Sequence, residues 1–215
     1  MVTGVGVLDK AVALLRAVAD EPGGLARLQE ATGLPRATSH RLAAALEAHG
    51  LLRRDRAGAY ELGPALVTFG RAAEARFPLV ERARPVLADL RDATGESVQL
   101  FTREGDRRRC VASLETPHGL RWIVPEGHLL PIDAGSAGHV LAGEPTSAGG
   151  WIESVGEREA GVASVSAPVV DADGAVVAAV SVSGPIERLT SHPGRRFGPA
   201  AVEAARAVAA ALAHR

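Results

Sequence analysis

Hydrophobic residues near the start of the chain recur at the spacing of helical turns. Val12, Leu15 and Val18 lie about one turn apart, which predicts a helix over residues 9–19. Asp9 precedes this pattern and is the residue type that caps a helix N-terminus, so we expect it to be the N-cap. The Pro-Gly-Gly sequence at 22–24 ends the helix.

Two more helical patterns follow at short intervals. Residues 25–32 are amphipathic and stop at Gly33, and residues 36–48 follow Pro35, a residue type favoured at a helix start. The side chains predicted to form the buried stripe of the third helix are Leu42, Ala45 and Leu46.

A hairpin completes this region. Residues 51–54 and 59–62 are predicted as short strands, because the segment between them, Asp55 to Gly58, has the residue types of a tight turn. Tyr60 and Leu62 are expected to turn into the core. Three helices followed by a hairpin are the element order of a winged helix-turn-helix, which we assign to residues 1–63.

Residues 64–77 predict a further helix with an unusually apolar face. Pro64 suits its first turn, and the face consists of Leu66, Phe69, Ala73 and Phe77. This face could pack onto the protein's own body, or it could be shared between two subunits. We favour the second interpretation, a linker helix that makes a homodimer and, through further contacts, could make a homotetramer.

From residue 78 onward, helices alternate with several β-rich segments. This alternation predicts an α+β domain over residues 78–215. The helices are predicted at 80–93 and 198–214, single strands at 97–103, 107–114 and 120–124, and a hairpin at 161–171 and 175–184.

Composition narrows the class of protein. A length of 215 residues suits two small domains, and no apolar run is long enough for a membrane span. The first residues carry charges within their apolar stretch, unlike a secretory signal, so we expect a cytoplasmic protein without a membrane partner. The single cysteine, Cys110, excludes an internal disulfide framework, and neither a cofactor nor a metal is expected.

Charge is distributed unevenly along a chain whose net charge is -1. Residues 33–60 carry five arginines against two acidic residues, a patch suited to phosphates. The first turns of a recognition helix reach base edges in the major groove, and a basic wing grips the backbone. The residues predicted to contact double-stranded operator DNA are therefore Arg36, Thr38, Ser39, His40, Arg41, Arg53, Arg54 and Arg56.

Several longer motifs resemble one family over nearly the whole chain. The segments ATGLPRATSHRLAAALEAHGLL, ESVGEREAGVASVSAPV and VVAAVSVSGPIERLTSHPGR are similar to the IclR family of transcription regulators. The last two are most similar to its actinobacterial NdgR/LtbR-type subgroup, which is linked to amino-acid metabolism and leucine biosynthesis. The resemblance implies a winged helix-turn-helix, a dimerising linker helix and a GAF-like effector-binding domain for a small carboxylate or amino acid.

The resemblance also implies where an effector would bind. A ligand-binding turn of the family corresponds to residues 136–139 here, and the family's Ser-x-Ser-Gly-Pro strand corresponds to residues 181–185. Alternate residues of a strand face one side, so two serine hydroxyls could converge on one carboxylate. The candidate effector-binding residues are Ser136, Ala137, Ser154, Val162, Ser164, Ser181 and Ser183.

The chain departs from the family at two places near this pocket. His139 stands where the family usually has lysine, and residues 142–151 are much shorter than the corresponding family segment. A helix that borders the pocket in relatives is therefore expected to be missing. We accordingly expect weak effector binding that has little effect on operator affinity.

Other functions have weaker support in the sequence. Cys110, His118, His128 and His139 fit no zinc-binding spacing, and AGSAG at 134–138 lacks the first glycine of a nucleophile elbow. A catalytic role is therefore not expected. The alternatives to a ligand-responsive regulator are a ligand-independent DNA-binding protein with a degenerate effector domain and, more remotely, a small-molecule enzyme.

Overall fold

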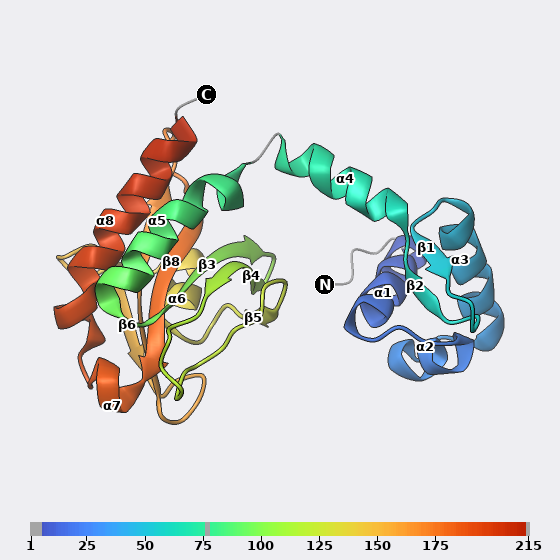
Figure 1. The fold of residues 1–215 in the computed structure, drawn as a ribbon, viewed down its shortest axis with the longest axis horizontal. Helices are drawn as coiled ribbons and strands as arrows, with labels where there is room; N and C mark the ends of the chain where they lie inside the picture. The colour runs from blue at the N-terminus through green and yellow to red at the C-terminus, as the bar shows by residue number, and fades with distance from the viewer. Residues whose placement is uncertain (1–5, 76–77, 214–215) are drawn as a thin grey trace. The chain divides into compact units, whose positions relative to one another are not determined.

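The computed structural model describes residues 6–75 and 78–213 (Figure 1). The chain divides into two units, Met1–Phe77 and Pro78–Arg215, which we call the N-terminal and C-terminal units. The N-terminal unit contains α1 (Gly6–Asp20), α2 (Leu25–Thr32), α3 (Arg36–Ala48), β1 (Leu52–Arg54), β2 (Tyr60–Leu62) and α4 (Pro64–Glu74).

The core of the N-terminal unit is small and is drawn from all three of its first helices. Leu14 and Val18 of α1, Leu28 of α2 and Tyr60 of β2 are almost fully buried together. Gly33 adopts a left-handed conformation (φ 67°) that ends α2, so the helix-turn-helix predicted at this position is confirmed.

Three details of this unit differ from the sequence prediction. Asp9 lies in the first turn of α1, which is already helical at Gly6, so it is not the N-cap. Leu62 is 41% exposed, because β2 ends there and the chain turns away into α4. Of the predicted stripe of α3, Leu46 is buried and Leu42 half-buried, but Ala45 is exposed, and Ser39 and Ala43 are buried instead.

The C-terminal unit is an α+β fold. Its elements are α5 (Leu79–Thr94), β3 (Ser97–Glu104), β4 (Arg107–Leu114), β5 (Leu129–Pro131), α6 (Ser136–Ala142), β6 (Ile152–Val155), β7 (Val162–Val170), β8 (Val176–Pro185), α7 (Ile186–Leu189) and α8 (Pro193–Ala213). The six strands form one antiparallel sheet in the order β5-β4-β3-β8-β7-β6. This architecture fits the GAF-like domain expected from the sequence.

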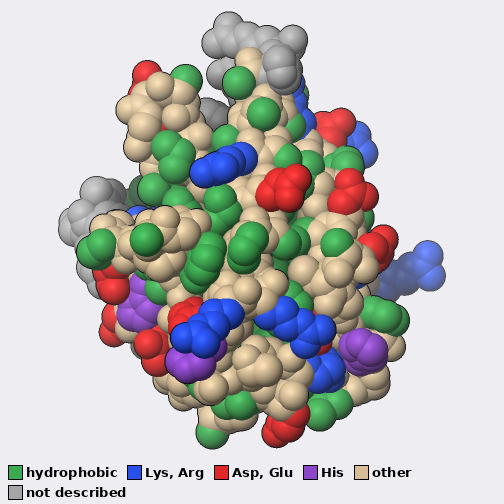
Figure 2. Space-filling view, turned by 90° about the vertical axis from the view of Figure 1, so that its left-hand side faces the viewer, with side chains coloured by type: hydrophobic (Ala, Val, Ile, Leu, Met, Phe, Trp, Pro, Cys, Tyr) green, Lys and Arg blue, Asp and Glu red, His purple; other side chains and the backbone are tan. Residues whose placement is uncertain are grey.

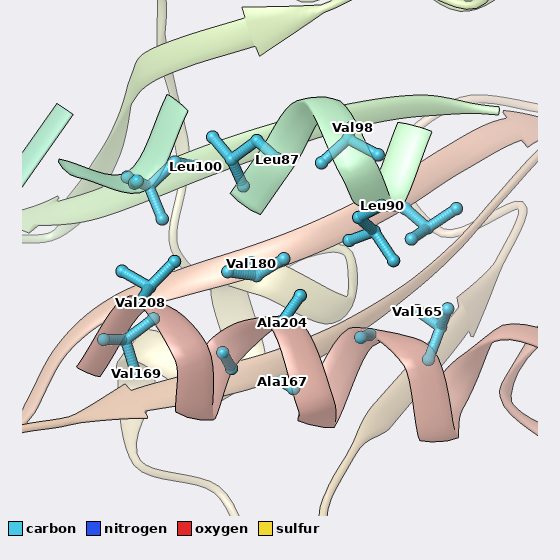
Figure 3. Close-up of a cluster of buried hydrophobic side chains, with 14 of the residues drawn as sticks. Leu87, Leu90, Val98, Leu100, Val165, Ala167, Val169, Val180, Ala204 and Val208 are labelled. Atoms are coloured by element: carbon cyan, nitrogen blue, oxygen red, sulfur yellow. The ribbon is translucent and has the colours of Figure 1, made fainter. Parts of the chain in front are cut away.

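Two long helices, α5 and α8, cover one face of the sheet (Figures 1 and 3). Alternate strand residues point toward them, and Figure 3 shows Val98 and Leu100 of β3 near α5 and Val169 of β7 near Val208 of α8. These aliphatic side chains are buried against one another, so hydrophobic burial stabilises the unit from this side. The short helix α6 packs on strands of the same sheet through a separate cluster of buried residues.

A β-bulge in β4 changes which residues face that second cluster. Leu100 pairs with Ala112 but the next residue, Phe101, pairs with Cys110, so Val111 has no partner on β3. Ala112 consequently packs under α5 and α8, whereas Cys110 packs with Phe101 on the α6 side. Bulges redirect side chains in this way because the alternation of faces shifts by one residue.

Two predicted elements of this unit were wrong. Residues 120–124 do not form a strand, and the edge strand of the sheet is β5, at 129–131. Val124 is nevertheless buried, which explains the apolar pattern of that segment. The last helix begins at Pro193, five residues before the predicted start.

Candidate functional site

The polar face of α3 carries most of the residues predicted to contact DNA. Arg36, His40 and Arg41 are exposed, and Thr38 is half-buried. Ser39 is different, because it is fully buried and its hydroxyl donates to the carbonyl of Leu34 at 3.4 Å. Ser39 therefore does not present its hydroxyl to a ligand outside the protein, and the surface of α3 is formed by the other four.

The arginines of the hairpin are not equivalent. Arg53 forms an ion pair with Glu61 on the paired strand. Arg54 donates to Glu47 of α3 (3.1 Å) and to the Tyr60 hydroxyl (2.5 Å), and it stacks over the Tyr60 ring. The hydrogen bond to Glu47, followed by the charge of Tyr60, raises the pKa of Arg54. Arg54 therefore joins the hairpin to α3.

Arg56 lies at the tip of the hairpin and is exposed. In the part of the chain that the structure describes, neither Arg56 nor Arg36 and Arg41 on α3 has a carboxylate within ion-pair distance. Asp55 shapes this tip by accepting hydrogen bonds from the backbone N–H groups of Ala57 (2.9 Å) and Ala59 (2.8 Å). Arg36 and Arg41 on α3 and Arg56 at the hairpin tip are therefore available to bind an external anion.

The face of the C-terminal unit shown in Figure 2 has a different character. Basic, acidic and hydrophobic side chains are interspersed on it. A surface of mixed charge is not the pattern of a phosphate-binding patch, which requires clustered basic groups.

A cavity lies between the sheet of the C-terminal unit and α6. It is lined by residues from several strands and from the loop before α6. Every effector-binding residue predicted from the sequence lines it, namely Ser136, Ala137, Ser154, Val162, Ser164, Ser181 and Ser183. Residues that are distant in the sequence are brought together here because β6, β7 and β8 are neighbours in the sheet.

Serine hydroxyls form much of the polar wall. The Ser136 hydroxyl, at the start of α6, lies 2.7 Å from the hydroxyls of both Ser164 and Ser166 on β7. On β8, Ser183 donates to Oε1 of Gln99 at 2.9 Å. Ser181 and Ser183, alternate residues of β8, both line the cavity and both are almost fully buried.

Among the lining residues that the prediction missed are Gln99, Phe101, Arg108 and Arg158. Gln99 had a visible signal, since it is a polar residue between apolar ones in a buried strand. Arg108 had none, because alternation counted from Ala112 would place it under the helices. The bulge at Val111 sends it to the cavity instead.

Arg108 is only 3% exposed. Its Nη1 donates to the carbonyls of Pro131 and Ala134, the latter at 2.6 Å, and its guanidinium lies over the Phe101 ring. Burial, followed by the nearby charge of Arg158, lowers the pKa of Arg108 to about 10, so the group remains charged at neutral pH. Gly138 is explained by the close approach of the Ile132 backbone carbonyl and of the Arg108 guanidinium, which leave no room for a Cβ atom.

The cavity is small in this structure. Its volume is about 30 Å³, room for about one or two water molecules. Metabolite pockets typically measure about 300–1,000 Å³. Binding of a metabolite therefore requires the surrounding side chains or loops to move.

The shortened segment is fixed at one corner of the cavity. His139 lies between two carboxylates, with Nδ1 2.7 Å from Glu144 and Nε2 2.8 Å from Glu157. Glu157 also accepts the backbone N–H of Gly135 at 2.7 Å. Burial opposes protonation of His139, but hydrogen bonds to the two carboxylates outweigh it and raise the pKa of His139. Charged contacts thus join α6 to the segments on either side of β6.

The geometry offers little to the alternative chemistries. Among residues 6–75 and 78–213, no three His, Cys, Asp or Glu side chains are grouped as a metal site. Burial raises the pKa of the Cys110 thiol to about 12, which makes the thiol a poor nucleophile at neutral pH. Ser136 bonds to other serines and not to a histidine, unlike the nucleophile of a hydrolase. Within the same described ranges, no helix is long and apolar enough to cross a membrane.

Comparison with known proteins identifies the family. Residues 7–56 match the IclR helix-turn-helix domain, and residues 72–144 and 144–210 match the bacterial transcriptional regulator IclR C-terminal domain. The chain belongs to the IclR family of transcription regulators. The two parts of the C-terminal match meet at residue 144, within the segment that is shorter than expected for an IclR protein.

Individual IclR proteins are similar over the whole chain. The HTH-type transcriptional regulator BhcR of Paracoccus denitrificans is 27% identical over 248 residues, covering 99% of this chain and 89% of its own. An ICLR transcriptional regulator from Silicibacter sp. TM1040 has the same fold (TM-score 0.80, 23% identity, 96% of both chains). So does an IclR homolog from Microbacterium hydrocarbonoxydans complexed with 4-hydroxybenzoate (TM-score 0.78, 20% identity, 96% of this chain and 98% of the other).

Membership of the IclR family settles the general function. The protein is a DNA-binding transcription regulator with a C-terminal effector domain. The curated relatives it resembles are transcription regulators.

Proposed function

We propose that the chain acts in the cytoplasm as a homodimer that binds a palindromic or near-palindromic operator and responds to a small carboxylate or amino acid. The observation that supports the DNA-binding surface most directly is a set of exposed cations on α3 and the hairpin tip, Arg36, Arg41 and Arg56. Among the described residues, no carboxylate lies within ion-pair distance of them. Operator reading is assigned to Arg36, Thr38, His40 and Arg41, and phosphate contact to Arg56. Arg53 and Arg54 are secondary, because carboxylates already engage them.

The effector assignment rests on the serine-lined cavity and its buried arginine. Serine hydroxyls and a guanidinium are suitable partners for a carboxylate. The Microbacterium homolog, which has the same fold, is complexed with a carboxylate, 4-hydroxybenzoate. The sequence resemblance to leucine-biosynthesis regulators supports the further proposal that the target genes belong to amino-acid metabolism, in particular that of branched-chain amino acids.

DNA recognition can be tested without knowing the operator. Duplexes selected from a random pool by the wild-type protein would provide the probe. Arg41→Ala should weaken binding to the selected duplex by about 1–3 kcal/mol if Arg41 reads a base. Arg56→Ala should instead lower the slope of log affinity against log salt by about one, because one phosphate contact is lost.

Arg121→Ala is the matched control, since Arg121 is an exposed arginine of the C-terminal unit that pairs with Glu115. Its affinity should equal that of the wild type. If the triple variant Arg36→Ala, Arg41→Ala, Arg56→Ala binds the selected duplex as tightly as the wild type, the DNA surface lies elsewhere.

A ligand-independent DNA-binding protein is the second candidate. The small cavity and the shortened 142–151 segment favour it. A thermal-shift screen with branched-chain amino acids, their keto and hydroxy acids and other small carboxylates separates the two, because a ligand that binds the folded protein raises its melting temperature with saturation. Saturable stabilisation would reject the second candidate.

A further inference from the structure

Among the described residues at and beside the cavity of the C-terminal unit, several buried hydrogen-bond donors have no acceptor. In the described part of this unit, three buried side-chain polar atoms have no hydrogen-bond partner. They are Nε2 of Gln99, Nε of Arg108 and Nε1 of Trp122, and all three are N–H donors. Gln99 and Arg108 line the cavity, and Trp122 lies against Arg158, which also lines it.

Unpaired donors at one place indicate what is absent from it. A buried donor without an acceptor destabilises the folded protein, and more so if it is charged. Oε1 of Gln99 already accepts a hydrogen bond from Ser183, and Nη1 of Arg108 already donates to two carbonyls. The three atoms named above that lack a partner are therefore all donors. The group that would satisfy them is an acceptor with several lone pairs.

The charge of the cavity also favours an acceptor, and in particular an anion, as the missing group. Arg108 is 3% exposed, yet no carboxylate lies within ion-pair distance of it among the described residues. Asp133 and Glu157 act on it only from farther away, and Arg158 adds a second positive charge. Buried charges are normally paired, so this guanidinium is incomplete without an anion.

Arg158 occupies the outer part of the same site. It is half-buried and stacks on the Trp122 ring, with its guanidinium carbon 4.6 Å from the ring centre. Glu159, the one carboxylate among the residues lining the cavity, is exposed. The positive charge therefore lies deeper than the negative charge.

We infer that Arg108 is the residue that recognises the effector's charge, and that the effector is a small organic acid without an amino group. Its carboxylate meets Arg108 and the Gln99 amide, and its hydroxyl or keto oxygen meets the serines. An amino acid is rejected because its ammonium group would bring a third cation and more donors to a site that already lacks acceptors. This inference rests on the proposed function and chooses between the two effector classes named there.

Matched sets of compounds test the charge requirement on the unmodified protein. The sets are lactate, lactamide and alanine, and 2-hydroxy-4-methylpentanoate, its amide and leucine, with ionic strength kept equal by sodium chloride. The readout is calorimetry on the wild-type protein, supported by Trp122 fluorescence in a Trp151→Phe background. In at least one set, the acid should bind roughly ten- to a hundredfold more tightly than the amide and the amino acid.

Variants then assign the charge to one residue. Arg108→Gln should reduce the acid's affinity by roughly ten- to a hundredfold and abolish the preference for acid over amide, whereas Arg108→Lys should keep part of that preference. The control is Arg107→Gln, on the exposed neighbour in β4. A purely structural Arg108 would change melting temperature without changing the preference. If Arg108→Gln does not fold, the choice among acid, amide and amino acid by the wild-type protein decides the question.

Three results would overturn the inference: no acid of the sets binds, the amide or the amino acid binds as tightly as the acid, or folded Arg108→Gln keeps the preference. Binding of the selected DNA duplex is measured in parallel without any acid. A failure of that measurement rejects the proposed DNA-binding surface and leaves the result for the cavity standing on its own.

Discussion

His139 couples the stability of the C-terminal unit to pH. Both of its ring nitrogens face carboxylates, so both must carry protons to donate, and the imidazolium form is favoured in the folded state. Because the folded pKa of His139 is raised, its stabilising contribution is complete below the unfolded value of about 6.5 and is lost as pH rises through the folded pKa. Stability should therefore fall between weakly acidic and weakly basic pH.

Tryptophan fluorescence can measure this effect in the full chain, because both tryptophans, Trp122 and Trp151, belong to the C-terminal unit. His139→Gln should flatten the dependence of the melting temperature on pH in that range. His128→Gln is the control, at an exposed histidine of the same unit. An unchanged pH dependence in His139→Gln would show that the ion pairs contribute nothing to stability.

At lower pH, protonation of Glu157 limits the stability that its ion pair with His139 provides. Its burial opposes ionisation, but the hydrogen bonds from the Gly135 backbone N–H and from His139 outweigh burial and lower the pKa of Glu157. The stabilisation it provides is therefore present above the unfolded value of about 4.3 and disappears as pH falls through the lowered folded pKa. The contacts between His139 and Glu157 should therefore contribute most to stability at pH values at which both side chains are charged.

At the scale of helices and strands, α4 exposes two large apolar side chains to solvent. Phe69 is 61% exposed and Val67 57%. Of the predicted face, Leu66 is half-buried, Ala73 is exposed, and Phe77 lies outside the described residues. Large apolar side chains exposed on one helix are typical of an interface, in support of the proposed homodimer.

Phe69→Glu should therefore give monomers, because a buried, unpaired carboxylate is expensive at an interface. Loss of the second recognition helix should weaken operator binding by on the order of 10²–10⁴-fold. Light scattering and DNA titration check the two effects. Thr68→Glu, at the exposed neighbouring position, should leave the dimer intact. If Phe69→Glu is still dimeric, the interface does not include this face.

The elements that sequence predicted well are those in which a single pattern determines the structure. α2 and α3 have the predicted bounds, since glycine and proline mark their ends. Residues 120–124 were predicted as a strand because they are apolar, yet periodicity does not distinguish a strand from a buried loop that packs through Val124. The start of α8 was predicted five residues late, since the helix begins at Pro193 and contains Pro199 in its interior.

The site shows the same limit at single residues. The serines could be predicted because a resemblance to a family supplied them, and their placement around one cavity follows from strand order. Ser39 was assigned to DNA from its neighbours alone, although its i+4 and i+7 residues, Ala43 and Leu46, place it on the buried stripe. Arg108 could not be predicted, since its direction depends on a one-residue bulge that sequence does not show.

At the scale of the whole molecule, the two units must communicate if an effector is to release DNA. A ligand shifts operator affinity only by its different affinity for two conformations, and couplings of about 5–150-fold are typical. The resemblance predicts that a helix bordering the cavity is missing, and the short segment 142–151 is fixed to α6 through the contact between Glu144 and His139. This attachment leaves less mobile structure beside the cavity that could differ between two conformations.

We therefore expect weak effector binding and a change in operator affinity below about fivefold. Calorimetric titration of the best acid into the protein, with and without the selected duplex, measures both quantities. A double variant, Ser181→Ala and Ser183→Ala, should remove whatever binding exists. Tight binding with coupling well above fivefold would mean that the short segment still closes the site.

The bulge in β4 also affects how the chain tolerates changes in length. Val111 has no partner on β3, so its deletion should leave Arg108 facing the cavity, Cys110 on the α6 side and Ala112 under the helices. Deletion of Arg109 would instead turn Arg107 toward the cavity, because faces alternate along a strand. Three consecutive arginines thus make the position redundant: after either deletion a guanidinium still faces the cavity, and the preference for anions should survive both.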